Sequence, residues 1–101
     1  MQPESLDEVV LAQVCGALAR LDRRMANRPM TRDTSVVDDL GIDSLRFVDL
    51  TVILEEQLQI REFPLQDWYD SEAQKSGKRF TVGSLVSLCT ELMSESASNP
   101  R

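Results

Sequence analysis

The fold of this chain is organised around one stretch, Val37-Asp38-Asp39-Leu40-Gly41-Ile42-Asp43-Ser44-Leu45. The pattern indicates a loop that gives way to an amphipathic helix, and Gly41 permits a tight backbone turn just ahead of it. Asp43 and Ser44 are both good N-cap residues, so we predict that the helix begins at one of them. The rest of the chain would then be a small scaffold that presents Ser44.

Two apolar stripes follow Ser44 along the predicted helix. The first recurs at the helical period and comprises Phe47, Leu50, Leu54 and Leu58. The second comprises Leu45, Val48 and Val52, bordered by Asp49, Glu55 and Glu56. We assign the first stripe to the core. For the second, two interpretations stay open: a helix that is buried on both faces, or an exposed apolar strip with an acidic rim that binds a partner.

Negative charge is concentrated in the same region. The chain carries 17 acidic and 11 basic residues, a net charge of −6, and six of the acids lie within residues 38–58 with Arg46 as the only base there. An acidic surface repels phosphate backbones, so nucleic acid is not an expected partner. Basic proteins are the expected partners, because opposite charges speed association.

The absence of histidine limits the chemistry of the chain. It excludes Ser–His and Cys–His nucleophilic catalysis, and the four glycines are too widely spaced for a phosphate-binding loop.

Cys15 and Cys89 lie in apolar helical patterns, so we expect two free, core-facing thiols in a reducing cytosol and no metal site. No signal peptide or membrane-spanning run is recognised. The prediction is a cytoplasmic protein that is not an enzyme and does not associate with membranes.

The hydrophobic periodicity predicts an all-α fold, a small antiparallel bundle of three main helices plus a short third helix. The first helix is expected over about residues 6–24, with Ser5 and Glu8 as a capping box. Residues 26–43 lack a sustained period but contain apolar side chains, which indicates a long loop pinned to the core.

The second half of the chain predicts two further helices. Pro64 would end any helix that continues from the second one. Asp67 would cap a short helix over about residues 68–74, in which Trp68 packs inward, and Thr81 would cap the last helix. The whole chain, 1–101, is expected to form a single domain with a core over about 6–94 and flexible tails at 1–4 and 95–101.

Ser44 has the right position for a covalently attached phosphate group. A serine at a helix N-terminus is usually no more than a cap. An exposed helix N-terminus nevertheless favours an anion, because unpaired amide N–H groups and the positive end of the helix dipole meet there. A phosphate ester on Ser44 would be stabilised at that position.

At this point the sequence resembles a known family. The residues from Asp39 to Leu45 are similar to the attachment motif of acyl carrier proteins, Asp-Leu-Gly-x-Asp-Ser-Leu. The resemblance extends upstream through residues 35–41 and downstream through residues 48–50 and the acidic pair Glu55-Glu56. It covers roughly residues 6–94, and its central motif is highly specific.

The resemblance implies a mechanism and a set of roles. A separate phosphopantetheinyl transferase, using coenzyme A and Mg²⁺, would place 4′-phosphopantetheine on the Ser44 hydroxyl, and Asp43 would help to position that partner and its metal. The thiol of this arm would carry an acyl or aminoacyl group, the cargo, as a thioester. The partner-docking face implied by the resemblance comprises Leu45, Val48, Asp49, Val52, Glu55 and Glu56.

The resemblance also implies further partners and a pathway. A loading ligase or acyltransferase would supply the cargo, a ketosynthase or another pathway enzyme would receive it, and the carrier would act as a monomer. Arg46 stands where carriers of fatty acid synthesis usually have an acid, which favours polyketide-type metabolism. Two alternatives stay open: an aminoacyl or peptidyl carrier of a nonribosomal-peptide or hybrid pathway, and an unmodified helical adaptor that binds partners through helix 44–58.

The segment 61–79 looks longer than the usual link in such carriers, and it contains basic residues near its end: Lys75, Lys78 and Arg79. We hypothesise that it tailors partner choice or shelters the cargo. The alternative is a solvated surface extension.

Overall fold

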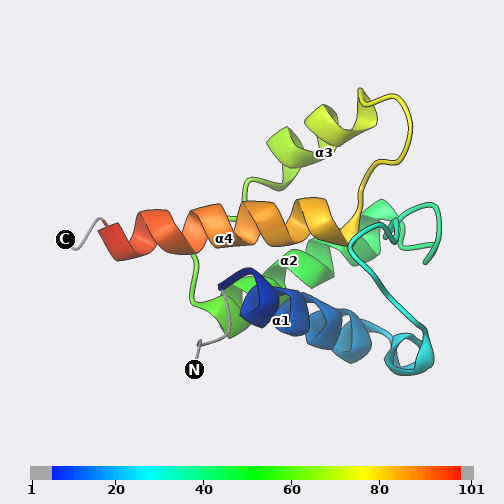
Figure 1. Cartoon of the computed structure of the whole chain (residues 1–101), viewed down its shortest axis with the longest axis horizontal. Helices are drawn as coiled ribbons and strands as arrows, with labels where there is room; N and C mark the ends of the chain where they lie inside the picture. The colour runs from blue at the N-terminus through cyan, green and yellow to red at the C-terminus, as the bar shows by residue number, and fades with distance from the viewer. Residues whose placement is uncertain (1–5, 99–101) are drawn as a thin grey trace.

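The computed structural model describes residues 6–98, with side chains to residue 94. It contains α1 (Leu6–Leu21), the 3₁₀ helix η1 (Arg23–Asn27), α2 (Ser44–Leu58), α3 (Leu65–Ala73) and α4 (Val82–Ser98), as Figure 1 shows. In this part of the chain, extended pairing is limited to an isolated bridge between Ser35 and Thr81. The predicted all-α bundle with a short third helix is therefore confirmed.

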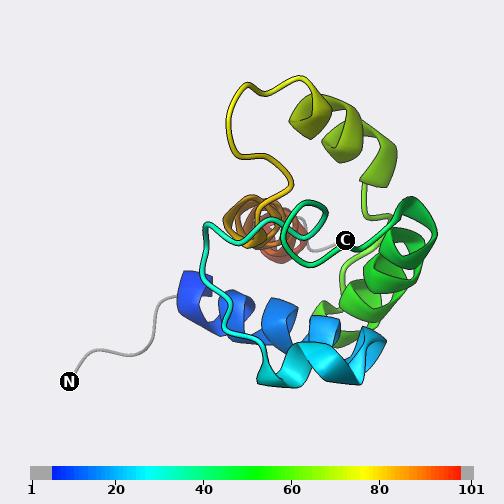
Figure 2. The same cartoon turned by 90° about the vertical axis from the view of Figure 1, so that its right-hand side faces the viewer.

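The core lies between α1, α2 and α4. Figure 2 views α4 nearly end-on, with α1 below it, α2 to one side and α3 above. Each of the three long helices contributes one apolar stripe, because residues three and four apart share a helix face. The fully buried members of these stripes are Val10, Val14, Ala17, Leu18, Phe47, Leu50, Leu54, Val82, Leu85, Val86 and Cys89. The assignment of the first α2 stripe to the core is confirmed.

The first helix ends earlier than residue 24. α1 stops at Leu21, and the carboxylate of Asp22 then accepts the backbone N–H of Arg24 at 3.0 Å, which caps η1. An Asp side chain that satisfies a free N–H favours the start of a new helix over the continuation of the old one. The proposed capping box cannot be placed, because Ser5 lies outside the described residues.

The long loop over residues 26–43 is pinned to the core, as predicted. Its apolar side chains Val36, Leu40 and Ile42 are buried. Its backbone also bonds to the chain ahead of α4, since the N–H of Val36 donates to the carbonyl of Phe80 at 2.8 Å. The loop is therefore part of the folded body and holds the start of α2 in place.

The same loop supplies the N-terminal cap of α4. The N–H groups of Val82 and Gly83 donate to the carbonyls of Thr34 and Arg32, both at 2.8 Å, and the Thr81 hydroxyl accepts the next N–H at 3.1 Å. The predicted Thr81 cap is confirmed. A Cβ at Gly83 would lie 3.0 Å from the Arg32 carbonyl oxygen, so only glycine permits this close approach without a shift.

The short third helix begins at Leu65 instead of near Trp68. Pro64 occupies its N-cap position, and Asp67 falls within its first turn, where a carboxylate interacts favourably with the helix dipole without capping the helix. α2 itself already ends at Leu58, and the left-handed conformation of its C-cap residue Gln59 (φ 57°) closes the helix before the proline. Trp68 is buried, as predicted.

α4 continues through Ser98, so its backbone extends into the expected C-terminal tail at 95–101. Residues 1–5 and 99–101 lie outside the described residues. None of the helices in the described part is long and apolar enough to cross a membrane.

Both cysteines are free, as predicted. Cys89 is fully buried, and burial raises the pKa of its thiol to about 12. Cys15 is only half-buried, so the expectation of a core-facing thiol holds fully for Cys89 alone. Neither thiol is in an environment that would activate it as a nucleophile.

Candidate functional site

Ser44 is the first residue of α2, and its side chain is exposed. The cap is the preceding residue: the Asp43 carboxylate accepts the N–H of Arg46 at 2.9 Å, and the Asp43 carbonyl accepts the N–H of Phe47 at the same distance. The Ser44 hydroxyl makes no hydrogen bond within the described part of the chain. The predicted helix start is confirmed, and capping by Asp43 leaves the serine hydroxyl available.

A hollow of about 250 Å³ lies beside Ser44 between α2 and α3. Its lining is mainly apolar and comprises Ser44, Phe47, Val48, Leu65, Gln66 and Tyr69. The hydroxyl of Ser44 therefore borders both solvent and an apolar recess. A phosphate ester fits here, since it would lie in water at a helix N-terminus while its substituent could reach the recess.

The second apolar stripe of α2 is exposed. Leu45, Val48 and Val52 are 79%, 48% and 51% exposed. The interpretation of a helix buried on both faces is therefore wrong. Exposed large apolar side chains in one strip are typical of a surface that binds a partner.

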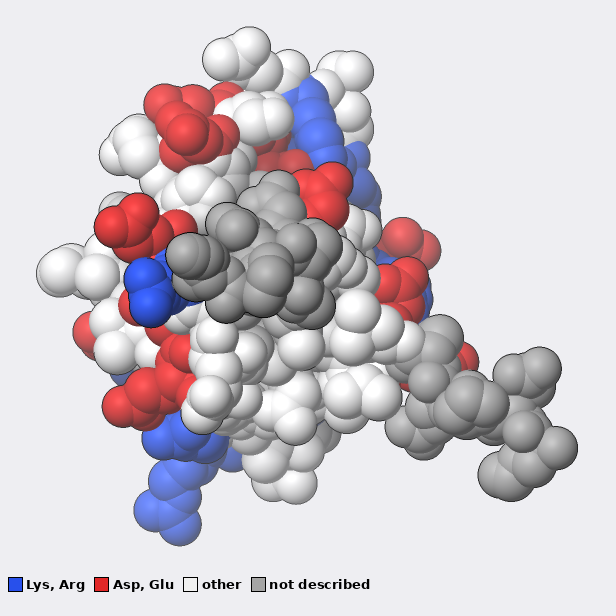
Figure 3. Space-filling view, turned by 90° about the vertical axis from the view of Figure 1, so that its left-hand side faces the viewer, with Lys and Arg blue, Asp and Glu red and all other residues white. Residues whose placement is uncertain are grey.

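The acidic residues along this stripe differ in their surroundings. Asp49 and Glu56 are exposed, whereas Glu55 is half-buried and accepts the backbone N–H of Phe63 at 2.8 Å. Figure 3 shows acidic side chains along the left edge of the view, with basic side chains beside them and further acidic side chains on the right. Glu55 thus secures the link between α2 and α3, which the sequence did not reveal.

Arg46 forms an ion pair inside the chain. Its Nη1 lies 3.2 Å from Oδ2 of Asp22, and Nη2 of Arg24 lies 2.8 Å from the same oxygen. Hydrogen bonds from Arg24, with the charge of Arg46 as a smaller contribution, hold the pKa of Asp22 well below its usual range. The end of α1 is therefore tied to the first turn of α2 beside Ser44.

Asp39, within the motif, has a structural role. Its Oδ2 accepts the N–H of Ser35 at 2.8 Å and the ammonium of Lys78 at 2.9 Å. These two bonds, the first most strongly, lower the pKa of the carboxyl. The carboxylate closes the turn before the motif and attaches the segment that precedes α4.

The three basic residues near the end of segment 61–79 are engaged within the chain. Lys78 binds Asp39, Nη1 of Arg79 donates to the carbonyl of Ala73 at 2.9 Å, and Nζ of Lys75 lies 2.6 Å from Oε2 of Glu72. Glu72 is buried, which sequence reasoning missed. A signal was present, because Glu72 follows Trp68 by four residues and so shares the inward face of α3.

Comparison with known proteins gives the class of this site. Residues 10–71 match the family described as the phosphopantetheine attachment site. The chain is 29% identical over 84 residues to the acyl carrier protein AcpXL of Rhizobium etli, covering 81% of this chain and 84% of that protein. It is 40% identical over 62 residues to an acyl carrier protein of Clostridium perfringens (strain SM101), covering 61% of this chain and 70% of that protein.

The chain belongs to the phosphopantetheine-attachment family, and within it to the acyl carrier proteins. It is accordingly a carrier and not a catalyst, and its cofactor is 4′-phosphopantetheine. Its chemistry takes place on partner enzymes, in general transferases and synthases.

Proposed function

We propose that Ser44 is the residue that carries the phosphopantetheine arm. The observation that carries this proposal is the exposed Ser44 hydroxyl, which no other group of the described chain engages, at the first residue of α2. Asp43 supports it by capping the helix, which frees Ser44 from that task. The residue also lies within the stretch that matches the attachment-site family.

The attachment step needs nothing from this chain except the hydroxyl and its placement. The Ser44 oxygen attacks the phosphorus of coenzyme A that bears the pantetheine, a phosphodiester bond forms, and the phosphoanhydride bond breaks to release 3′,5′-ADP. A base of the transferase takes the serine proton, since the described residues include no histidine and no hydrogen-bond partner for this hydroxyl. Asp43 serves as a charged neighbour for the partner and its metal ion.

We further propose that the exposed α2 stripe is the surface on which partners dock. Leu45, Val48 and Val52 form its apolar centre, and Asp49 and Glu56 are its freely exposed charges. Glu55 belongs to the same face, but its bond to the Phe63 N–H gives it a structural task as well. The exposure of these side chains supports the proposal, because burial of apolar area on binding is favourable.

For the pathway, we propose polyketide-type or related natural-product biosynthesis, with a loading ligase or acyltransferase and a ketosynthase among the partners. The pathway proposal is supported by Arg46, which stands where carriers of fatty acid synthesis usually have an acid. In this fold Arg46 forms an ion pair with Asp22. An aminoacyl or peptidyl carrier is the alternative. Membership of the acyl carrier family argues against an unmodified adaptor. The monomeric state and the cytoplasmic location stay predictions.

For segment 61–79, we propose that it shelters the cargo. Three of its residues, Leu65, Gln66 and Tyr69, line the hollow beside Ser44. The basic side chains near its end, Lys75, Lys78 and Arg79, are bonded within the chain, which gives less support to a role for them in partner choice. Exchanging residues 61–79 for the shorter link of another carrier tests both roles, and loading by the cognate enzyme at an unchanged rate would contradict partner choice.

The mass of the intact protein tests the attachment site. The apo-protein is incubated with coenzyme A and a promiscuous phosphopantetheinyl transferase, and we expect one phosphopantetheinyl addition. Ser44→Ala should abolish it, whereas Ser87→Ala, at an exposed serine on α4, should not. An addition that survives Ser44→Ala would contradict the proposal.

A further inference from the structure

α3 stands apart from the helices of the bundle. Figures 1 and 2 show it joined to α2 and α4 only through extended links. The backbone hydrogen bonds at its two ends run only to residues close in sequence. Large side chains, not backbone contacts, therefore set the place of α3 relative to α2 and the hollow.

Aromatic rings make the first set of these contacts. The Phe47 ring of α2 lies 5.2 Å from the Trp68 ring and 6.2 Å from the Tyr69 ring, measured between centroids. Both α3 rings also contact Phe80 in the segment before α4, at 5.8 and 4.7 Å. Such contacts are favourable, because they bury large apolar area and the ring pairs have preferred arrangements.

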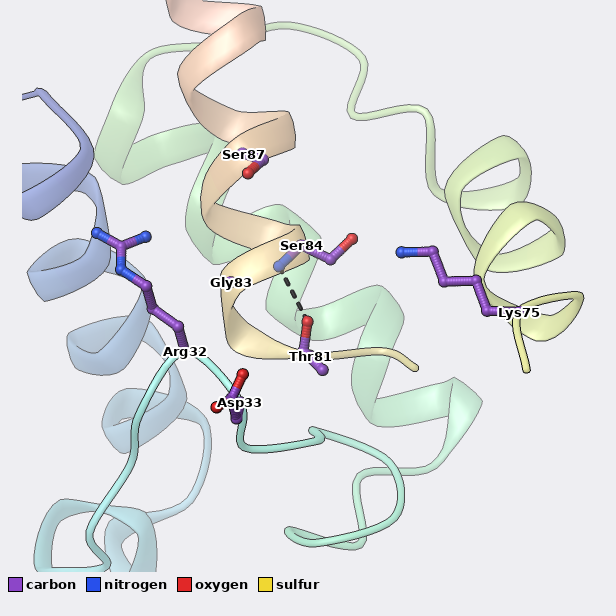
Figure 4. Close-up of a pocket in the computed structure, with 7 residues that line it drawn as sticks. All are labelled: Arg32, Asp33, Lys75, Thr81, Gly83, Ser84 and Ser87. Carbon is purple, nitrogen blue, oxygen red and sulfur yellow. Dashed lines mark hydrogen bonds between the residues drawn. The ribbon is translucent and has the colours of Figure 1, made fainter. Parts of the chain in front are cut away.

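Glu72 makes the second, directional set of contacts. It is 2% exposed, and its carboxylate accepts three hydrogen bonds: from the N–H of Phe80 at 2.6 Å, the hydroxyl of Ser84 at 2.7 Å and the ammonium of Lys75 at 2.6 Å. The Ser84 hydroxyl also accepts the indole N–H of Trp68 at 3.0 Å. Figure 4 shows Lys75 extending toward Ser84 across a second hollow at the start of α4. Two of the three donors, Phe80 and Ser84, lie in or next to α4, so the buried carboxylate fixes α3 to this part of the chain in both distance and direction.

Glu72 also holds the backbone of Phe80. That residue has a left-handed conformation, with φ 57°. For a bulky residue this conformation is strained and persists only when surrounding contacts enforce it. Here the enforcing contacts are the N–H bond to Glu72 and the carbonyl bond from Val36. The position of α3 and that of the chain entering α4 are thus coupled through one carboxylate.

We propose that Glu72 is a positioning residue that sets how well the hollow beside Ser44 shelters an apolar acyl group. Tyr69 lies one turn before Glu72, and Leu65 and Gln66 lie on the same helix, so half of the lining moves with α3. At about 250 Å³ the hollow is smaller than the ~300–1,000 Å³ typical of pockets for drug-sized ligands, and it suits a short unbranched chain. This inference rests on the proposed attachment of the arm to Ser44.

The experiment compares a long with a short acyl group on the same arm. A promiscuous transferase loads the apo-protein from octanoyl-coenzyme A or from acetyl-coenzyme A. Hydroxylamine then attacks the thioester carbonyl, which forms the hydroxamate and releases the arm thiol for detection. Each rate is divided by that of the matching pantetheine thioester free in solution. We expect the native protein to slow cleavage of the octanoyl thioester and leave the acetyl thioester, which is too short to fill the hollow, nearly unprotected.

Glu72→Gln should remove most of the octanoyl protection. The cleavage rate of the octanoyl thioester should rise roughly tenfold, because loss of a buried charged hydrogen-bond partner shifts equilibria by at least that factor. Acetyl cleavage should not change. The matched control is Asp67→Asn, at an exposed carboxylate on the same helix, which should behave as the native protein. A merely structural role for Glu72 would lower the unfolding temperature and leave the octanoyl-to-acetyl ratio unchanged, and that result would overturn the proposal.

Ser84→Ala provides a second, milder variant, because it removes one donor and leaves the carboxylate its other two. It should lose part of the octanoyl protection even if Glu72→Gln does not fold, and an unchanged octanoyl-to-acetyl ratio in Ser84→Ala would overturn the proposal.

Equal protection of octanoyl and acetyl groups in the native protein would overturn the proposal as well. Absence of any mass gain on loading would overturn both this inference and the attachment to Ser44, whereas a mass gain with an unchanged ratio would overturn this inference alone.

Discussion

α2 and α3 face each other across the hollow beside Ser44. They differ in which side chains they expose and which they bury. α2 exposes apolar side chains, with Leu45 79% in solvent. α3 buries a carboxylate, Glu72, and satisfies it with three donors. Exposed apolar side chains gain free energy when a binding partner covers them. A buried charge instead needs hydrogen-bond donors or opposite charges from the same folded chain. The difference supports the proposal that α2 presents a surface to partner proteins, whereas α3 is held in place by contacts within the chain.

The largest expected effect separates the two stripes of α2. Leu50→Ala should lower the free energy of unfolding by about 2–5 kcal/mol, because it leaves a cavity in the core. Val52→Ala, in the exposed stripe, should change it by no more than about 0.5 kcal/mol. Urea denaturation measures both, and a comparable loss for Val52→Ala would show that this stripe is packed in solution.

The next effect concerns the buried carboxylate of α3. Glu72→Gln should lower the free energy of unfolding by about 1–3 kcal/mol, since an amide cannot accept all three hydrogen bonds and leaves Lys75 without its pair. Asp67→Asn, at an exposed site on α3, should fall within about 0.5 kcal/mol of the native protein. Equal stability of the two variants would remove the contrast between α2 and α3.

The pH dependence of stability sharpens the same contrast. Burial by itself raises the pKa of Glu72, but the hydrogen bonds from Lys75, Ser84 and Phe80 outweigh it and leave that pKa below its ordinary value. Stability from this group is therefore present above the pKa of an unfolded glutamate and is lost as the pH falls through the lower folded pKa. The difference in unfolding free energy between the native protein and Glu72→Gln should shrink from pH 7 toward pH 3, and a difference that grows would contradict the sign.

Docking through α2 predicts a loss of partner activity without a loss of stability. Leu45→Ser should reduce the kcat/KM of the transferase by roughly tenfold, because it removes the most exposed apolar side chain of the stripe. The unfolding temperature should stay within a few degrees of the native value. As a control, Leu6→Ser changes an exposed leucine on α1, away from the stripe, and should leave kcat/KM unchanged.

The smallest effect separates two adjacent acids of α2. Glu56→Lys should slow partner reactions by only a few-fold, and mainly at low salt, because exposed charges act on association rates and are screened. Glu55→Lys should slow them similarly and should also destabilise the protein, since it removes the acceptor of the Phe63 N–H. Kinetics that respond to neither change would contradict the docking face.

Local patterns predicted much of the fold and the centre of the site. The step of three and four residues identified the α2 core stripe, and the short polar side chains of Asp43 and Thr81 identified the starts of α2 and α4. These features depend on residues within a turn or two of each other. The start of α3 was misplaced because Asp67 is an equally good local cap, and the contacts that place α3 are nonlocal.

By itself the sequence determined that the protein is a helical bundle, where α2 begins, and that Ser44 stands at that point in an acidic neighbourhood. Helical periodicity and capping depend on residues close together in the sequence, and composition depends on no contacts at all. These features can therefore be recognised from the sequence alone. Only the tertiary structure decided that Leu45, Val48 and Val52 are exposed, that Asp22 pairs with Arg46, and that Glu72 is buried under Phe80 and Ser84. Burial and ion pairing depend on which segments meet in space, and residues 8 to 24 positions apart acquire these partners only when the bundle has formed.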